Sequence, residues 1–307
     1  KIWGYSAKQT LSIMQRLYEN YKILTYPRTD SRYITTDIVA TIPDRLKAIA
    51  IGEYRATADA LLKTKINGHK GFVDNSKVSD HHAIIPTEQK PNLALLSSEE
   101  RKIYDLVVKR FLSVMLPPFE YVQTTIEANV EGERLIAKGK VVKSKGWKKL
   151  YDHLEEDNCE DDIKEQVLPK VNKGDKVSLT KIELKTGQTK APARFTEATL
   201  LSAMENPHKY INVGKEAAKT LGETGGHGTV ATRADIIEKL FHTFLMEKRG
   251  NEIYLTSKAK QLLELVPEDL KKPELTADWE KKLSDISKGK LKQKVFLDGI
   301  REYTEEI

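Results

Sequence analysis

The chain of 307 residues has a single cysteine, Cys159, and no apolar run that approaches the roughly 18 residues that a membrane span needs. One cysteine excludes an intrachain disulfide framework and is typical of a reducing compartment, so we expect a cytoplasmic protein that makes no contact with a membrane. The chain begins with neither a methionine nor an apolar signal segment. We therefore expect it to continue a longer protein.

Hydrophobic residues make up 39% of the chain and charged residues 31%, a balance that is typical of globular proteins. The length predicts two or three domains. The formal net charge of +6 lies in the first third, because residues 1–110 hold 18 Lys and Arg against 12 Asp and Glu and the remainder is balanced. This asymmetry indicates a surface that faces a polyanion, although ordinary surface solubility explains a charge of this size equally well.

Residues 1–115 have mainly helical periodicity. Ser6 is expected to cap the first helix, and Ser97 and Glu100 form a capping box ahead of a later one. Residues 23–26 form a short, β-leaning run that ends at a proline. The first segment is therefore predicted to be helical with one extended interruption.

Pro117-Pro118 break the helical pattern, and residues 116–190 are predicted to be a β-rich segment. Apolar and polar side chains alternate over residues 122–130, Glu131-Gly132 provides a turn, and a second strand pattern covers residues 177–184. Two charged runs between these patterns are expected to be solvated faces or a loop, a basic one over residues 138–149 and an acidic one over residues 155–165.

Residues 191–307 return to helical periodicity. Helices are expected to begin at Thr196 and Thr232, and a turn at residues 249–251 joins two short strands ahead of another helix. This order of helix, hairpin and helix resembles a winged helix-turn-helix. Thr276 is expected to cap a last amphipathic helix.

The sharpest local feature is a phenol, a guanidinium and a carboxylate at alternate positions, Tyr26, Arg28 and Asp30. In an extended chain these side chains project to one side, so we expect them to converge on one point. A phenol is a competent covalent nucleophile, and a guanidinium binds two phosphate oxygens at once. Asp30 could orient Arg28, and Thr29 and Ser31 add hydroxyls directed at phosphate. The alternative interpretation is an ordinary Tyr-Pro turn followed by a helix cap.

Two adjacent histidines, His81 and His82, lie in a loop before an apolar run. Histidine is the commonest general acid or base, so both are candidate site residues. Neighbouring positions on a helix or strand cannot both face one metal ion, so we do not expect a metal site here. The alternative interpretation is one packed and one exposed histidine.

Two further helix starts place an arginine and hydroxyls where backbone N–H groups and the helix dipole attract phosphate. The candidates are Arg194 and Thr196 in the first, and Thr229, Thr232 and Arg233 in the second. Threonine at a helix start is also an ordinary cap, so only the two ends together favour contact with a nucleic-acid backbone.

Five motifs occur in order along the chain, and together they are highly specific. They are Tyr26-Pro27-Arg28-Thr29-Asp30-Ser31, His81-His82-Ala83-Ile84-Ile85-Pro86-Thr87, Pro192-Ala193-Arg194-Phe195-Thr196-Glu197, Gly228-Thr229-Val230-Ala231-Thr232-Arg233-Ala234 and Leu275-Thr276-Ala277-Asp278-Trp279-Glu280. This set resembles the motifs of type IA DNA topoisomerases, and the double-histidine and Tyr-Pro-Arg forms look most like the bacterial topoisomerase III branch. The resemblance covers essentially the whole chain.

The resemblance implies roles for individual residues. Tyr26 matches the nucleophile that forms a 5′-phosphotyrosyl bond with single-stranded DNA, and Arg28 matches the residue that holds the scissile phosphate. His81 matches the active-site histidine of the family, with His82 beside it. The implied reaction is strand cleavage, strand passage and religation, which relaxes and decatenates DNA without ATP. The chain accordingly lacks the glycine-rich phosphate loop of many nucleotide-binding proteins.

Mg²⁺ is the cofactor that the resemblance implies, held by carboxylates of an amino-terminal Toprim domain that also supplies a catalytic Glu and Lys. No Asp-x-Asp-x-Glu sequence occurs in this chain. We therefore expect a carboxy-terminal fragment that holds no metal and is inactive by itself.

The resemblance also implies a multidomain, mainly α fold with a β-rich arch, which forms part of a toroidal clamp. A helical domain carries the tyrosine over residues 1–115, the arch covers residues 116–190, and a winged-helix-like domain that lines the single-strand groove covers residues 191–307. Single-stranded DNA is the expected partner of a monomeric chain. The alternative function is a non-catalytic winged-helix DNA-binding protein, which leaves the tyrosine grouping and His81 unexplained.

Overall fold

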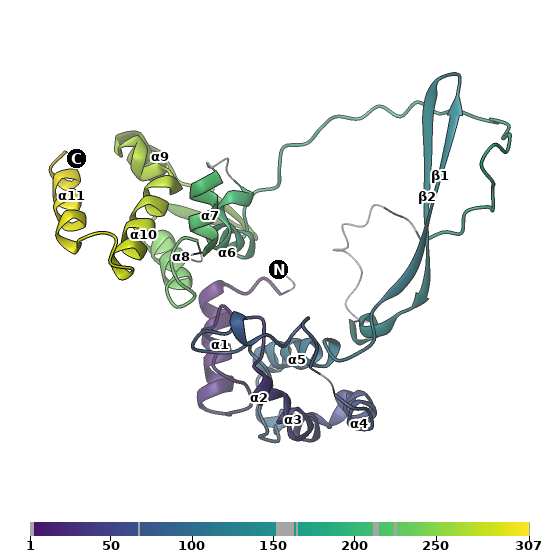
Figure 1. Ribbon diagram of the computed structural model, residues 1–307, viewed down its shortest axis with the longest axis horizontal. Helices are drawn as coiled ribbons and strands as arrows, with labels where there is room; N and C mark the ends of the chain where they lie inside the picture. The colour runs from purple at the N-terminus through teal and green to yellow at the C-terminus, as the bar shows by residue number, and fades with distance from the viewer. Residues whose placement is uncertain are drawn as a thin grey trace. The chain divides into compact units, whose positions relative to one another are not determined.

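The computed structural model describes residues 3–66, 68–151, 163, 165–210, 215–223 and 226–306. The chain forms two compact units, one of residues Leu17–Lys190 and one that combines Lys1–Arg16 with Ala191–Ile307 (Figure 1). Each helix in the described part of the chain is too short or too polar to span a bilayer. The predicted division into three domains stays a prediction.

Short helices and loops enclose the core of the unit Leu17–Lys190. Its α-helices in the described residues are α2 (Thr36–Val39), α3 (Ile42–Ile49), α4 (Arg55–Leu62) and α5 (Ser98–Ser113), and α1 (Ala7–Glu19) runs into it. The predicted capping box of α5 is confirmed, because Ser97 Oγ accepts the Glu100 N–H and the Glu100 carboxylate accepts the Ser97 N–H at 2.9 Å. Ser6 caps α1 as predicted, since its hydroxyl accepts the Gln9 N–H at 3.0 Å.

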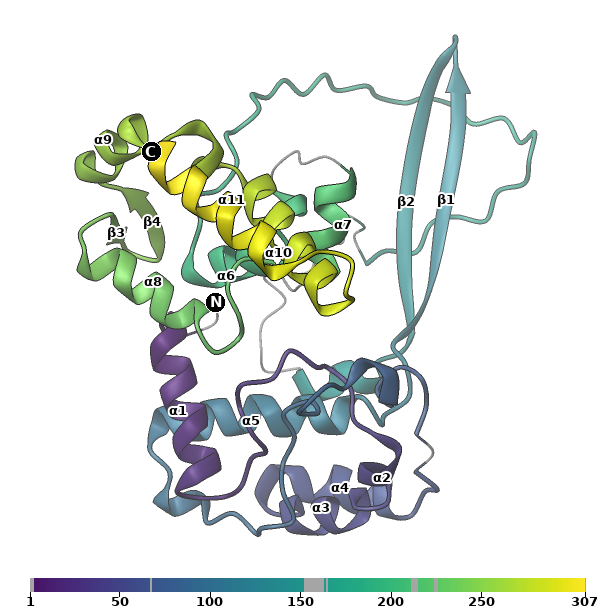
Figure 2. The ribbon, with the colours of Figure 1, turned by 60° about the vertical axis from the view of Figure 1, so that its left-hand side comes forward.

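A long antiparallel hairpin of β1 (Glu120–Val130) and β2 (Glu133–Ser144) extends from the same unit (Figure 2). Glu131 and Gly132 form its turn, with φ of 50° and 94°. A two-residue turn with two positive φ angles matches the twist of the strands that it joins. The predicted first strand and its turn are confirmed.

Of two further predictions for this segment, the first is confirmed and the second is wrong. The basic run 138–149, predicted to be a solvated face or a loop, contributes residues 138–144 to β2, and its lysines are exposed or half-buried. Residues 177–184 form no strand, and Leu184 is 91% exposed. Alternating side chains make a strand only when a neighbouring edge accepts the backbone hydrogen bonds, and the described residues supply none there. The acidic run 155–165, which includes Cys159, lies outside the described residues except for Ile163 and Glu165.

The second unit is built on a small antiparallel hairpin and the helices around it. Its helices are α6 (Glu197–Glu205), α7 (Lys215–Glu223), α8 (Arg233–His242), α9 (Ser257–Leu265), α10 (Pro273–Ser287) and α11 (Gln293–Glu306), and its strands are β3 (Met246–Arg249) and β4 (Glu252–Leu255). Ile237, Met246 and Ile253 are buried at the centre of its core, which α6 and α8 cover. The predicted helix starts at Thr196 and Thr232 and the predicted hairpin are confirmed.

The carboxy-terminal helices differ from the prediction. Thr276 lies inside α10, which begins three residues earlier at Pro273. Proline is favoured at the first helical position because its missing N–H would be unpaired there in any case. Helix α11 follows, where the sequence analysis expected no further helix.

Tyr104 and Tyr54 provide a matched test of the core of the unit Leu17–Lys190. Tyr104 is 1% exposed, its hydroxyl has no hydrogen-bond partner among the described residues, and burial raises its pKa. Tyr104→Phe should therefore raise the free energy of unfolding by about 1 kcal/mol, because the variant no longer desolvates an unpaired hydroxyl. Tyr54→Phe should lower it by about 1 kcal/mol, since the Tyr54 hydroxyl donates to Asp105 at 2.8 Å. Urea denaturation measures both changes, and shifts of the same sign would contradict the assignment.

Candidate active site around Tyr26

A short antiparallel contact joins residues 23–25 to residues 83–87, and we call this contact the clip. Thr25 donates its N–H to the Ile85 carbonyl at 3.0 Å, and its hydroxyl accepts the Ile85 N–H at 2.9 Å. Leu24 and Pro86, which pair at the centre of the clip, are both buried. Because one threonine binds its partner through both backbone and side chain, the clip fixes the positions of the residues at its ends.

Tyr26 and His81 lie at one end of the clip. Their ring centroids are 4.2 Å apart with 36° between the ring planes. Tyr18, at the end of α1, packs edge-on against the Tyr26 ring with 5.6 Å between centroids. The clip therefore brings together the candidate nucleophile and the candidate histidine, which lie in distant parts of the sequence.

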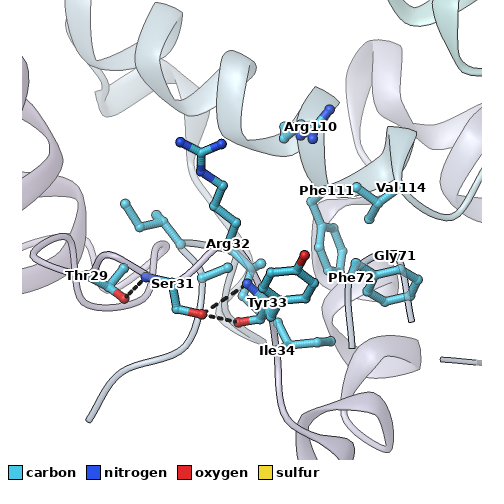
Figure 3. Close-up of a pocket in the computed structure, with 13 residues that line it drawn as sticks. Thr29, Ser31, Arg32, Tyr33, Ile34, Gly71, Phe72, Arg110, Phe111 and Val114 are labelled. Carbon is cyan, nitrogen blue, oxygen red and sulfur yellow. Dashed lines mark hydrogen bonds between the residues drawn. The ribbon is translucent and has the colours of Figure 1, made fainter. Parts of the chain in front are cut away.

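The hydroxyls of Thr29 and Ser31 hold the next part of the segment. Thr29 donates to the His81 carbonyl at 2.9 Å, and Ser31 donates to the Lys77 carbonyl at 2.8 Å. Ser31 also accepts the Tyr33 N–H at 3.1 Å (Figure 3). Both hydroxyls retain lone pairs, but their donor protons are used within the fold.

The remaining predicted site residues of this unit surround the same segment. His82 Nδ1 lies 2.7 Å from the Ala83 carbonyl, and because a carbonyl oxygen only accepts, this nitrogen is the donor. Arg28 is half-buried and Asp30 is exposed. The expected convergence of Tyr26, Arg28 and Asp30 on one point stays a prediction.

Arg45 is a positioning residue that the sequence analysis missed. It lies on α3 at 5% exposure, donates to the Pro86 carbonyl at 2.7 Å and pairs with Glu88 at 2.8 Å. Burial lowers the pKa of the Arg45 guanidinium, and Glu88 partly offsets this effect. The available signal was a cation within the apolar stripe that runs from Ile42 to Ile49. Arg45 thus fastens one side of the clip to a helix.

In the other unit, Arg194 and Thr196 lie where α6 meets β4. Thr196 caps α6, since its hydroxyl accepts the N–H of the third helical residue at 3.3 Å. The Phe195 carbonyl accepts the Ile253 N–H at 2.7 Å, and the Arg194 guanidinium lies 4.3 Å from the centre of the Tyr254 ring. These contacts place Arg194 against the small hairpin.

The second candidate helix start has a different arrangement. The Thr232 hydroxyl accepts the Thr229 N–H at 2.9 Å and so closes a turn ahead of α8. Arg233 is 9% exposed and donates to the His227 carbonyl at 3.0 Å and the Gly228 carbonyl at 3.1 Å. Arg233 therefore holds this loop in shape, and contact of these three residues with DNA stays a prediction.

The described residues do not fit the Mg²⁺ ion that the resemblance implies. Over the described part of the chain, no three His, Cys, Asp or Glu side chains gather closely enough to hold a metal ion. We therefore derive no chemical step through a metal from this chain.

The family model described as DNA topoisomerase matches residues 1–298. The chain belongs to the DNA topoisomerase family. It is 59% identical over 309 residues to DNA topoisomerase 3 of Bacillus anthracis and 55% identical over 308 residues to DNA topoisomerase 3 of Bacillus subtilis. Each comparison covers 100% of this chain and 42% of the relative, so the chain spans less than half the length of these relatives.

The fold of this topoisomerase chain is similar to that of full-length topoisomerase I from Thermotoga maritima. The TM-score is 0.58 at 21% identity, over 99% of this chain and 47% of that structure. The expected resemblance to type IA topoisomerases is confirmed, as is a helix-rich fold with small antiparallel sheets.

The role of Arg45 is testable by stability. Arg45→Leu should lower the free energy of unfolding by about 1–3 kcal/mol, because the buried Pro86 carbonyl loses its donor. Lys47→Ala on the same helix removes an exposed cation that pairs with Asp44. This substitution should change the free energy of unfolding by less than about 0.5 kcal/mol. Chemical denaturation compares the variants, and equal effects would refute a positioning role for Arg45.

His227 predicts a pH dependence for the second unit. Burial lowers the pKa of His227, and the nearby Arg233 cation adds to this effect. The fold therefore favours the neutral ring, so its contribution to stability is present above about pH 6.5 and is lost as the pH falls toward the lowered folded pKa. The melting temperature should drop between pH 8 and pH 5, and His227→Gln should reduce that drop. Parallel curves for the two proteins would disprove this linkage.

Proposed function

We propose that this chain carries the nucleophile of a type IA DNA topoisomerase of the topoisomerase III kind, which cleaves and rejoins single-stranded DNA. The observation that carries the proposal is the contact between the Tyr26 and His81 rings, whose centroids are 4.2 Å apart, beside Arg28 on the segment of Tyr26. A phenol with a guanidinium on its own segment and an imidazole packed against its ring suits attack on a phosphodiester.

The proposed step exchanges one phosphoester for another. The Tyr26 oxygen attacks the phosphorus, the bond from phosphorus to the 3′-oxygen breaks, and that oxygen leaves with a proton as a free 3′-hydroxyl. Arg28 binds the phosphate oxygens and stabilises the charge that develops on them. His81 packs against the Tyr26 ring, and we propose that it takes part in proton transfer. Because the tyrosyl ester retains the phosphoester bond, attack by the 3′-hydroxyl reverses the step without ATP.

Two groups of residues are proposed to contact the strand. In the unit that carries Tyr26 they are Thr29, Asp30, Ser31 and His82. In the other unit they are Arg194, Thr196, Thr229, Thr232 and Arg233, on helices that we propose form a winged-helix-like domain of a toroidal clamp. The position of the Arg194 guanidinium over the Tyr254 ring supports this, because single-strand sites combine aromatic rings with cation–π contributions from arginine.

The proposal extends to the whole enzyme of which this chain spans a part. We propose relaxation and decatenation by a monomer in the bacterial cytoplasm, with a helical domain, a β-rich arch and a groove-lining domain. Mg²⁺ is proposed as the cofactor of that enzyme, with ligands supplied from beyond this chain. A non-catalytic winged-helix protein is not favoured, because it gives the pair of Tyr26 and His81 no role.

The test replaces the matching residues of Bacillus subtilis DNA topoisomerase 3 with this chain and incubates the chimera with labelled single-stranded DNA and Mg²⁺. A denaturation-resistant adduct linked to the 5′ end is expected. Tyr26→Phe should abolish it while single-strand affinity changes less than about twofold, since one hydroxyl adds little to a phosphate-dominated interface.

Two variants complete the test. Tyr18→Phe removes a hydroxyl from the ring that packs against Tyr26, and should leave the adduct intact. Arg28→Lys should reduce adduct formation about tenfold or more, because a point charge cannot bind two phosphate oxygens at once. Adduct that survives Tyr26→Phe would place the nucleophile elsewhere.

A further inference from the structure

A cavity of about 380 Å³ lies beside the segment that carries Tyr26 (Figure 3). Its walls are Thr29 and residues 31–34, Gly71 and Phe72, the Ala83–Ile85 part of the clip, and the end of helix α5 with Val114 after it. Small-ligand sites have volumes of about 300–1,000 Å³, so this one is large enough for a ligand. Thr29 lines the cavity and donates to the His81 carbonyl, so the cavity shares a wall with the candidate active site.

Aromatic rings form one side of this cavity. Tyr33, Phe72 and Phe111 line it, and both phenylalanines are buried, so their rings are held by packing (Figure 3). The Lys77 ammonium lies 4.4 Å from the centre of the Tyr33 ring and donates to its hydroxyl at 3.2 Å, which holds that ring as well. Fixed aromatic rings are the surfaces on which proteins stack nucleobases.

Two exposed cations lie at the same cavity. Arg32 comes from the segment after Tyr26, and Arg110 comes from the last turn of α5 (Figure 3). Within the described ranges, no carboxylate forms an ion pair with Arg110. Guanidinium groups bind phosphate through two parallel hydrogen bonds. Aromatic rings beside two such cations are a combination suited to a nucleotide.

We propose that this cavity binds one nucleotide of the strand that Tyr26 cleaves, with its base against the aromatic wall and its phosphate between Arg32 and Arg110. The proposal rests on the proposed function and adds a subsite to it. Three residues of chain span at most about 11 Å, so Thr29 keeps the cavity close to Tyr26. The nucleotide bound there lies within a few positions of the cleaved phosphate and fixes the register of the strand.

The first test measures binding of a fluorescein-labelled oligothymidylate to the 307-residue chain by anisotropy at several salt concentrations. Arg110→Ala should raise the dissociation constant about tenfold and make the log–log salt dependence less steep by about 0.7, the value for one phosphate on a single strand. Arg101→Ala is the matched control, because Arg101 is an exposed cation on the same helix and does not line the cavity. It should change the affinity less than twofold.

The second test locates the base directly. An oligothymidylate with one 5-iododeoxyuridine is irradiated in complex with the chain, and cross-linked peptides are identified by mass spectrometry. Cross-links are expected at Tyr33, Phe72 or Phe111. Their yield should be lower in the double variant that combines Arg32→Ala with Arg110→Ala. Cross-links confined to other parts of the chain would overturn the proposal.

The outcomes separate this inference from the proposed function. If the oligonucleotide binds but Arg110→Ala and Arg101→Ala behave alike, the cavity is no subsite, whereas the proposed function is unaffected. If the unmodified chain fails to bind it at any salt concentration, the proposed function itself is wrong. Release of the bound oligonucleotide by micromolar thymidine 5′-monophosphate would assign the cavity to a free nucleotide and overturn the strand subsite.

Discussion

The hydrogen bonds between Thr25 and Ile85 hold together two stretches of chain that are far apart in the sequence. Without them the Tyr26 ring would have no fixed relation to His81, and Thr29 could not reach the His81 carbonyl. Buried Arg45 completes this arrangement, because it lies on helix α3 and donates a hydrogen bond to the Pro86 carbonyl. The geometry of the candidate active site therefore depends on a small number of hydrogen bonds, of which the one from Arg45 is buried.

The same constraint shapes the cavity next to Tyr26. Its wall includes residues of the clip, and the hydroxyls of Thr29 and Ser31 are donors within the fold before any ligand binds. A site built in this way loses little side-chain entropy when it binds a strand, since its groups are already ordered. In the other unit, Arg233 has a similar role, because its guanidinium donates hydrogen bonds to two carbonyls of the loop ahead of α8 and so orders that loop before any ligand binds.

Local features of the fold were predictable wherever neighbouring residues decide the backbone. The capping box at Ser97 and Glu100 and the turn at Glu131-Gly132 lie where the sequence indicates, because each depends on residues at most three positions apart. The strand expected at residues 177–184 is wrong for the complementary reason. Alternation describes which side chains could be buried, but a strand also needs a partner, and no local pattern specifies one.

For the site, the sequence by itself determined the chemistry: a phenol and a guanidinium two residues apart, and a pair of histidines in a distinct motif. It also determined the family, because five ordered motifs rarely occur together by chance. Only the tertiary structure decided that the ring of His81 contacts Tyr26, that buried Arg45 holds the clip, and that a cavity with aromatic walls lies beside them. The physical reason is that these relations join residues distant along the chain, and packing rather than local preference brings such residues together.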